Sequence, residues 1–175
     1  MKTLHYPLTA LLGMAVAVAL HGANPAKDRV EVSFSDPEKF TDAADGPRGS
    51  DHGRDGNLDT IKQHLIERAS RVLPEGQRLS VTITDVDLAG EVEPWRTGAA
   101  QDIRLIKDIY SPRITLDYRV TDASGAVVKE GSARLSDLSF NMKLHANRSD
   151  ARVYEKDLID DWVRAEFGNK KNSKK

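Results

Sequence analysis

Four segments alternate apolar and polar residues with a period of two, which is typical of half-buried strands. Residues 30–34 and residues 79–84 each place every second side chain on one apolar face. Residues 114–120 and residues 126–135 alternate in the same way, and the turn sequence at residues 122–125 lies between them. A glycine in that turn can adopt a positive φ. The last two strands are therefore predicted to form a hairpin.

Two other segments repeat apolar residues at helical spacing, three or four positions apart. Asn57 or Asp55 is expected to cap the first helix, and residues 74–76, Pro-Glu-Gly, are expected to end it. Ser149 or Asp150 is expected to cap the second helix. The first apolar face comprises Leu58, Ile61, Leu65, Ala69, Val72 and Leu73, and the second comprises Tyr154, Leu158, Ile159, Trp162, Val163 and Phe167.

The remaining segments are less regular. Residues 41–56 are rich in Asp and Gly and are predicted to form a functional or mobile loop. Residues 103–109 are expected to add a short strand, and the alternation continues through residues 138–144. The predicted fold class is α+β, a single domain of order β-α-β-β-β-β-α. We expect an antiparallel-rich sheet with two helices packed on one face and a right-handed crossover between the first two strands.

The start of the chain has the layout of a secretory signal. A short basic start is followed by the apolar residues 8–20 and by small residues around residues 21–23. The apolar run is shorter than the ~20 residues that span a hydrocarbon core, so a cleaved leader is favoured over an anchor. Cleavage is expected after Ala23, and the Ala-Val-Ala sequence at residues 17–19 is the alternative. The expected location is the periplasm or the exterior.

This layout predicts a signal peptide at 1–23, one domain at 24–169 and a basic, disordered tail at 170–175. The chain has no cysteine, so the domain is expected to depend on its core instead of disulfides. Lys and Arg number 26 against 27 Asp and Glu, and five of the basic residues lie in the leader and the tail. The acidic body argues against nucleic acid as a partner.

Two aspartates follow the second strand. If that strand continued regularly, Asp85 and Asp87 would point into the core, which is costly for charged groups. The strand is therefore expected to end or bulge, leaving the pair at the end of the sheet. Such a pair can bind a divalent cation or share a proton. The favoured alternative is that Asp85 accepts local backbone amides and Asp87 is solvated.

A tryptophan lies close by, in a charged loop that contains a proline. Trp95 can anchor a partner or stack on a sugar ring, and it can equally fold back over the sheet. Both alternatives stay open at this point. The binding hypothesis combines Asp85, Asp87, Trp95 and Arg96 as one surface, with Trp95 as the apolar anchor and with no catalytic residue.

No metal or cofactor is expected. Residues 51–62 resemble a calcium loop, but Gly53 and Lys62 occupy positions that require oxygen ligands. The histidines His52, His64 and His145 have no zinc-binding spacing, and His64 is expected to face solvent. The sequence also has no nucleophile motif and no Gly-rich phosphate loop.

Several segments together resemble one known family. They are residues 30–37 with Phe40 and Asp42, residues 73–76, the Thr-Asp-Val-Asp-Leu-Ala-Gly run at residues 84–90, the hairpin at residues 118–131, and residues 154–156 with Trp162. The chain is similar over residues 30–167 to DUF3016, an uncharacterised envelope family of Gram-negative bacteria. The resemblance implies export and a single domain, and it brings no catalytic residue.

These observations favour a non-enzymatic periplasmic module that binds an envelope protein, peptide or polymer. No nucleic acid partner and no membrane span after cleavage are expected. A small hydrolase with a dispersed site around Asp85 and Asp87 is the first alternative. A cation-binding stress protein is the second.

Overall fold

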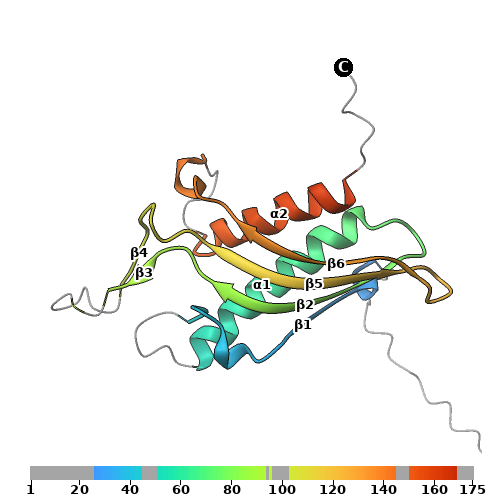
Figure 1. Cartoon of the computed structure of the whole chain (residues 1–175), viewed down its shortest axis with the longest axis horizontal. Helices are drawn as coiled ribbons and strands as arrows, with labels where there is room; N and C mark the ends of the chain where they lie inside the picture. The colour runs from blue at the N-terminus through green and yellow to red at the C-terminus, as the bar shows by residue number, and fades with distance from the viewer. Residues whose placement is uncertain (1–25, 45–50, 94, 96–102, 145–149, 169–175) are drawn as a thin grey trace, which may run out of the picture.

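Four strands form one mixed sheet, and two long helices cover one of its faces (Figure 1). The computed structural model describes residues 26–44, 51–93, 95, 103–144 and 150–168. The strands are β1 (Val30–Phe34), β2 (Arg78–Asp87), β5 (Arg113–Thr121) and β6 (Val127–Ser136), in the order β1-β2-β5-β6. The helices are α1 (Asp51–Val72) and α2 (Val153–Phe167). This architecture confirms the predicted α+β fold class.

The order of the strands follows from their connections. β1 and β2 pair in parallel because α1 lies between them in the chain, and this confirms the predicted strand-helix-strand unit. β2 pairs with β5, and β5 with β6, in antiparallel fashion. Asp122 stabilises the β5–β6 turn by accepting the amides of Ser124 and Ala126, and Gly125 has a φ of +87°. The predicted hairpin is confirmed.

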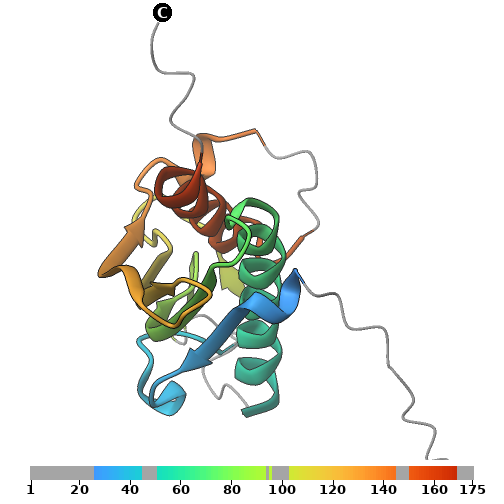
Figure 2. The same cartoon turned by 90° about the vertical axis from the view of Figure 1, so that its right-hand side faces the viewer.

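The core lies between the sheet and the two helices, which pack side by side (Figure 2). Alternate residues of β2 and β5 point into it, as their period predicted. Tyr118 and Phe167 pack edge-on against Trp162 of α2. The expected helix faces are buried except for Tyr154 and Phe167, which are half-buried, and Val72, which is 41% exposed. The central side chains are Val30, Val32, Ile61, Leu65, Leu79, Val81, Ile83, Ile114, Leu116, Leu158, Ile159 and Trp162.

The start of α1 differs from its prediction. The helix begins at Asp51, so the last six residues of the predicted loop at residues 41–56 are helical. Asn57 does not cap the helix, because its buried side-chain amide donates to the carbonyl of Ala43 at 3.1 Å. Local sequence preference cannot predict such a tertiary contact. Since residues 51–62 are helical, they do not wrap around an ion as a calcium loop does.

Two predicted strand segments also differ. Within residues 103–109, only β4 (Arg104–Leu105) is extended, and it pairs with β3 (Glu91–Val92) in a separate two-stranded ribbon. Residues 138–144 form a turn and the 3-10 helix η4 (Phe140–Met142) instead of a strand. Phe140 is buried there, whereas Leu138, Met142 and Leu144 are exposed, so their alternation does not correspond to a buried face.

The second helix begins close to its predicted start. Arg152 occupies the N-cap position without a side-chain cap bond, and Asp150 accepts the amide of Arg152 at 3.0 Å. Ser149 lies outside the described residues. The other short elements are the 3-10 helices η1 (Lys27–Arg29) and η2 (Pro37–Lys39). None of the helices in the described part of the chain is long and apolar enough to cross a membrane.

Candidate functional site

A bulge in β2 determines the direction in which the side chains of Asp85 and Asp87 point. The pairing of β2 with β5 shifts between Ile83 and Asp85, so Thr84 is the extra residue. Ile83 faces the core before the bulge, and Val86 faces it afterwards. Asp85 and Asp87 therefore lie on the face of the sheet that the helices leave open. The predicted bulge is present, and it keeps both carboxylates out of the core.

Each of these carboxylates has a partner of its own. Asp85 accepts the backbone amide of Thr41 at 2.8 Å and the Thr41 hydroxyl at 2.9 Å. Asp87 forms an ion pair with Arg113 of the neighbouring strand. Burial raises the pKa of Asp87, and Arg113 opposes that rise. The expected local amides are therefore wrong for Asp85, because the amide that it accepts is distant in sequence. Asp87 is ion-paired instead of solvated.

Arg104 joins the β3–β4 ribbon to this end of the sheet. Its guanidinium donates to both carboxylate oxygens of Asp42, at 2.7 and 3.0 Å, and to the carbonyls of Gly90 and Ala44. Asp42 itself bridges to Asp87 through the backbone. Only 11% of the Arg104 side chain is exposed. Sequence reasoning missed this residue, since its partners lie far away along the chain.

A buried glutamate fixes the turn that leads into the ribbon. Glu155 of α2 is fully buried, and it accepts the amide of Ala89 at 2.7 Å. Burial raises the pKa of Glu155, while Arg152 and Arg104 oppose that rise. The next residue, Gly90, has a φ of +80°, and a Cβ there would lie 2.6 Å from the carbonyl oxygen of Leu105. Only glycine fits this turn.

The location of Glu155 on the apolar face of α2 could have been predicted from the sequence. It precedes Leu158 and Ile159 by three and four residues, and it therefore lies on the apolar face of α2. A carboxylate on such a face needs a buried hydrogen-bond donor. Sequence reasoning missed it by treating the face as a set of apolar residues only.

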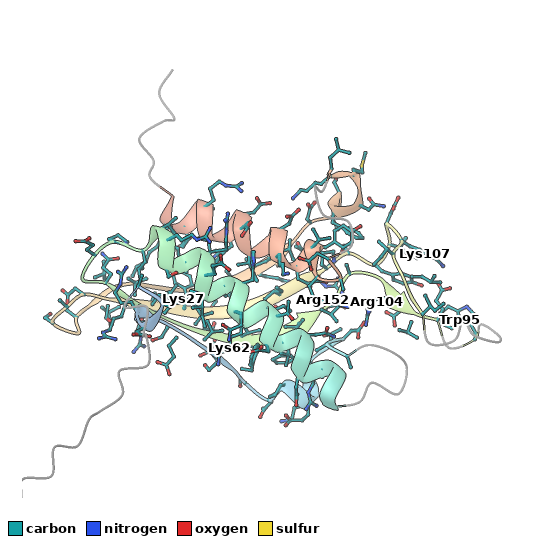
Figure 3. The ribbon with its side chains drawn as sticks, turned by 180° about the vertical axis from the view of Figure 1, so that it is seen from behind. Lys27, Lys62, Trp95, Arg104, Lys107 and Arg152 are labelled. Carbon is teal, nitrogen blue, oxygen red and sulfur yellow. The ribbon has the colours of Figure 1, made fainter. Side chains whose placement is uncertain are left out.

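The ribbon carries Trp95 away from the aspartates. Trp95 lies beyond β3, at the outer end of the ribbon and past Lys107, and 70% of it is exposed (Figure 3). Behind it, buried Glu93 forms an ion pair with Lys107 and accepts the hydroxyl of Tyr110. The structure thus brings Asp85 and Asp87 to one end of the sheet and sets Trp95 apart from them. Arg96 lies outside the described residues.

Trp95 belongs to a larger group of exposed apolar side chains at this end of the molecule. Residues 103–109 and residues 138–144 lie side by side here, because Asn141 donates to Asp108. The two segments and the ribbon project from the same end of the sheet (Figure 1). Exposure ranges from 44% for Ile106 to 91% for Leu144. We call this group the apolar end: Trp95, Ile103, Ile106, Ile109, Leu138, Met142 and Leu144.

The described lysines beside the apolar end are paired with carboxylates of the protein. Lys107 pairs with Glu93. Lys143 pairs with Asp137 at 2.8 Å and with Asp161 at 3.1 Å, and these contacts raise its pKa. The described lysines here therefore neutralise neighbouring carboxylates. Asp108, directly before Ile109, is exposed and accepts from Asn141, so the described carboxylates here outnumber the described lysines.

The open face of the sheet is different in character. Ser33, Thr82, Asp117 and Ser132 stand in one row across all four strands, and Ser132 donates to Asp117 at 2.5 Å. A shallow hollow of about 570 Å³ lies along this face. Hydroxyl and charged groups line the hollow, so water can cover this face without a partner.

The histidines do not assemble a metal site in the described part of the chain. His64 is half-buried and contacts Asp160 at 2.8 Å, so the expected solvent-facing orientation was wrong. Arg68 shares the same carboxylate oxygen at 2.7 Å. Among the residues described, no group of three or more His, Cys, Asp or Glu side chains is arranged to hold an ion. The side chains of His52 and His145 lie outside the described set.

Comparison with known proteins places the chain in a family. No curated protein matches it. A PelC dodecamer structure from Paraburkholderia phytofirmans aligns with 77% of this chain and 83% of its own, at 16% identity and a TM-score of 0.29. The sequence model of DUF3016, described as "Protein of unknown function", matches residues 28–165. Because that match spans most of the chain, this protein belongs to the DUF3016 family.

Proposed function

We propose that this protein is an exported, non-enzymatic module of the cell envelope that binds a macromolecular partner through its apolar end. The observation that carries the proposal is the apolar end itself. Large apolar side chains from the ribbon and two neighbouring segments project at one end of the molecule. Contiguous exposed apolar surface on a monomer marks an interaction site, because its exposure to water is unfavourable.

The segments that carry these side chains are held in place by buried polar contacts. Arg104 bonds the ribbon to Asp42, and Glu155 bonds the turn before the ribbon to α2. A surface ordered before binding loses less entropy when the partner arrives. The polar cluster at the end of the sheet is therefore interpreted as the support of the binding surface.

Binding is favoured over hydrolysis by the state of the carboxylates. Asp85 is engaged by Thr41, and Asp87 is engaged by Arg113. Burial raises the pKa of Glu155, but its side chain is fully buried. A general acid or base must reach its substrate. These contacts support a structural role for all three groups.

Export rests on the leader-like pattern of residues 1–23. The protein recovered from the periplasm is expected to be lighter than the full chain by the mass of roughly 20–25 residues, because the leader is cleaved. Recovery of the full-length chain from the membrane fraction would contradict this part of the proposal.

The binding surface is tested by photo-cross-linking in intact cells. A photoreactive residue replaces Ile109 or Leu144 at the apolar end, and the control replaces Val127 on β6. We expect adducts from the first two positions and a much weaker signal from the control, since Val127 is exposed but lies near the opposite end of β6. Equal labelling at all three positions would show that the apolar end is not the binding surface.

A further inference from the structure

We propose that β6 pairs, in antiparallel fashion, with β6 of a second copy of this chain, so that two sheets join into one. This inference goes beyond the proposed function and does not involve the apolar end. The two-fold axis stands perpendicular to the sheet, because that rotation relates two neighbouring antiparallel strands. Both copies then keep their helices on the same side, and the open face of each sheet stays in water.

The outer edge of β6 is open in the described structure. Among the residues described, β6 has one neighbouring strand, β5, and it forms the margin of the sheet (Figure 2). Alternate backbone N–H and C=O groups of such a strand point outward and can pair with another chain. β6 is ten residues long, and its pairing with β5 is regular from Lys129 to Ser136. The opposite edge, β1, has only five residues. β6 therefore offers the longer regular template.

The side chains on the helix side of β6 do not block this edge. A lysine on an edge strand usually protects it against pairing. Lys129 is held instead by Glu166 of α2, at 2.5 Å. The next two side chains on this side are small, Gly131 and Ala133, and Ala133 packs against the core. The centre of the edge is therefore accessible to a second strand.

The charges on the other side of β6 are self-complementary. Arg134 is exposed, and it has no partner among the described residues. Glu130 accepts the Nε–H of Arg119 through one carboxylate oxygen, at 3.1 Å. If two antiparallel β6 strands meet with Ser132 on the axis, Glu130 lies directly opposite Arg134 of the second copy. The two-fold axis repeats this pair, so each dimer gains two cross-strand ion pairs.

The same charges select one register. A slide of two residues places Glu130 opposite Ser132 or Ser136 and loses both ion pairs. A slide of four residues places Glu130 opposite Glu130, or Arg134 opposite Arg134, and like charges directly opposite each other are unfavourable. The Ser132 hydroxyl donates to Asp117 of β5 at 2.5 Å, so it is directed away from the axis. A strand from another protein would fit the backbone, but this symmetric order of charges favours a second copy.

A cysteine on the proposed axis tests the contact and its register, because the chain has no cysteine of its own. Directly opposite Cα atoms are about 4.5–5.5 Å apart, which a disulfide can bridge. Ser132→Cys is therefore expected to give a disulfide-linked dimer under mild oxidation. Ser136→Cys is the control on the same edge, since its two thiols would be on the order of 27 Å apart. Ser80→Cys is the control on the open face of β2. Both controls should cross-link at least about tenfold less on non-reducing gels.

Charge exchange tests the ion pairs. Sedimentation velocity of the protein isolated from the periplasm should show a dimer that increases with concentration, up to about 100 µM. Arg134→Glu places two like charges opposite each other twice, and so does Glu130→Arg. Each variant alone should dimerise at least about tenfold more weakly than the wild type. An equal mixture of the two variants should recover the affinity of the wild type, because opposite charges face each other again. Circular dichroism confirms that each variant is folded.

Three results would overturn the inference. One is a wild type that stays monomeric over the whole concentration range. Another is cross-linking of Ser132→Cys no faster than that of Ser136→Cys. The third is a dimer that Arg134→Glu leaves unchanged, which would place the contact elsewhere. The proposed function is tested separately, because a Val127 photo-adduct with a second copy has twice the mass of the chain and is distinguished from an adduct with another envelope protein.

Discussion

Replacing Arg104 by alanine tests whether the polar cluster holds the ribbon. The substitution removes a two-pronged ion pair with Asp42 and two bonds to backbone carbonyls. Removing one partner of a buried ion pair costs about 3–5 kcal/mol. The Asp42 side chain keeps 22% exposure, so water compensates part of its lost partner. We therefore expect Arg104→Ala to lower the free energy of unfolding by about 2–4 kcal/mol.

Urea melts followed by circular dichroism measure this loss, and the chain offers a matched control. Arg119 pairs with Glu130 on the open face, where both side chains are more than half exposed. Arg119→Ala is expected to cost less than about 1 kcal/mol. Arg104→Lys should recover only part of the loss, because lysine cannot bond both oxygens in the same fork. If Arg104→Ala costs no more than Arg119→Ala, the ribbon is not held by this pair.

Three further predictions concern single side chains. Burial raises the pKa of Glu155 above its ordinary 4.5, so the folded state binds this proton more tightly, and stability falls as the pH rises through the raised value. Glu155→Gln should flatten that part of a pH series of urea melts, and an unchanged slope would contradict it. Trp162→Ala should cost about 3–5 kcal/mol in the same melts, since the ring packs between Tyr118 and Phe167. A loss below about 1 kcal/mol would show that α2 is not docked there. Trp95→Ala should change thermal stability by less than about 1 kcal/mol, and a larger loss would place Trp95 in the core.

Sequence pattern predicted the parts of the fold in which one face is buried. Apolar residues alternate along β1, β2 and β5 and recur every three or four positions along α2, so these elements could be predicted from the sequence. The start of α1 was not readable, because Gly53 and Gly56 disfavour a helix locally and the contact of Asn57 with Ala43 is tertiary. The β3–β4 ribbon has strands of two residues, which are too short to show a period.

The candidate site was predictable only in part. Charged residues after an apolar run indicated the bulge at Thr84, because charge in the core is costly. The partners of those charges were not predictable, since Thr41 and Arg113 are brought in by the register of distant segments. The apolar end escaped notice for another reason. Apart from Trp95, its residues lie in segments that the sequence predicted as strands or as a continued alternation, and only the structure shows that they are exposed among the described residues.

The parallel pairing of β1 with β2 also sets an order of folding. The β5–β6 hairpin closes a turn of a few residues, whereas Val30 meets Leu79 only after the whole of α1 has been brought back. Closing the longer loop costs more entropy, so we expect the hairpin to form early and β1 to dock last. Until β1 arrives, the edge of β2 is open, and that edge carries Val81 and Ile83. The newly made chain is therefore most prone to aggregation through this edge, and a chaperone that shields it would protect the chain at the step of greatest risk.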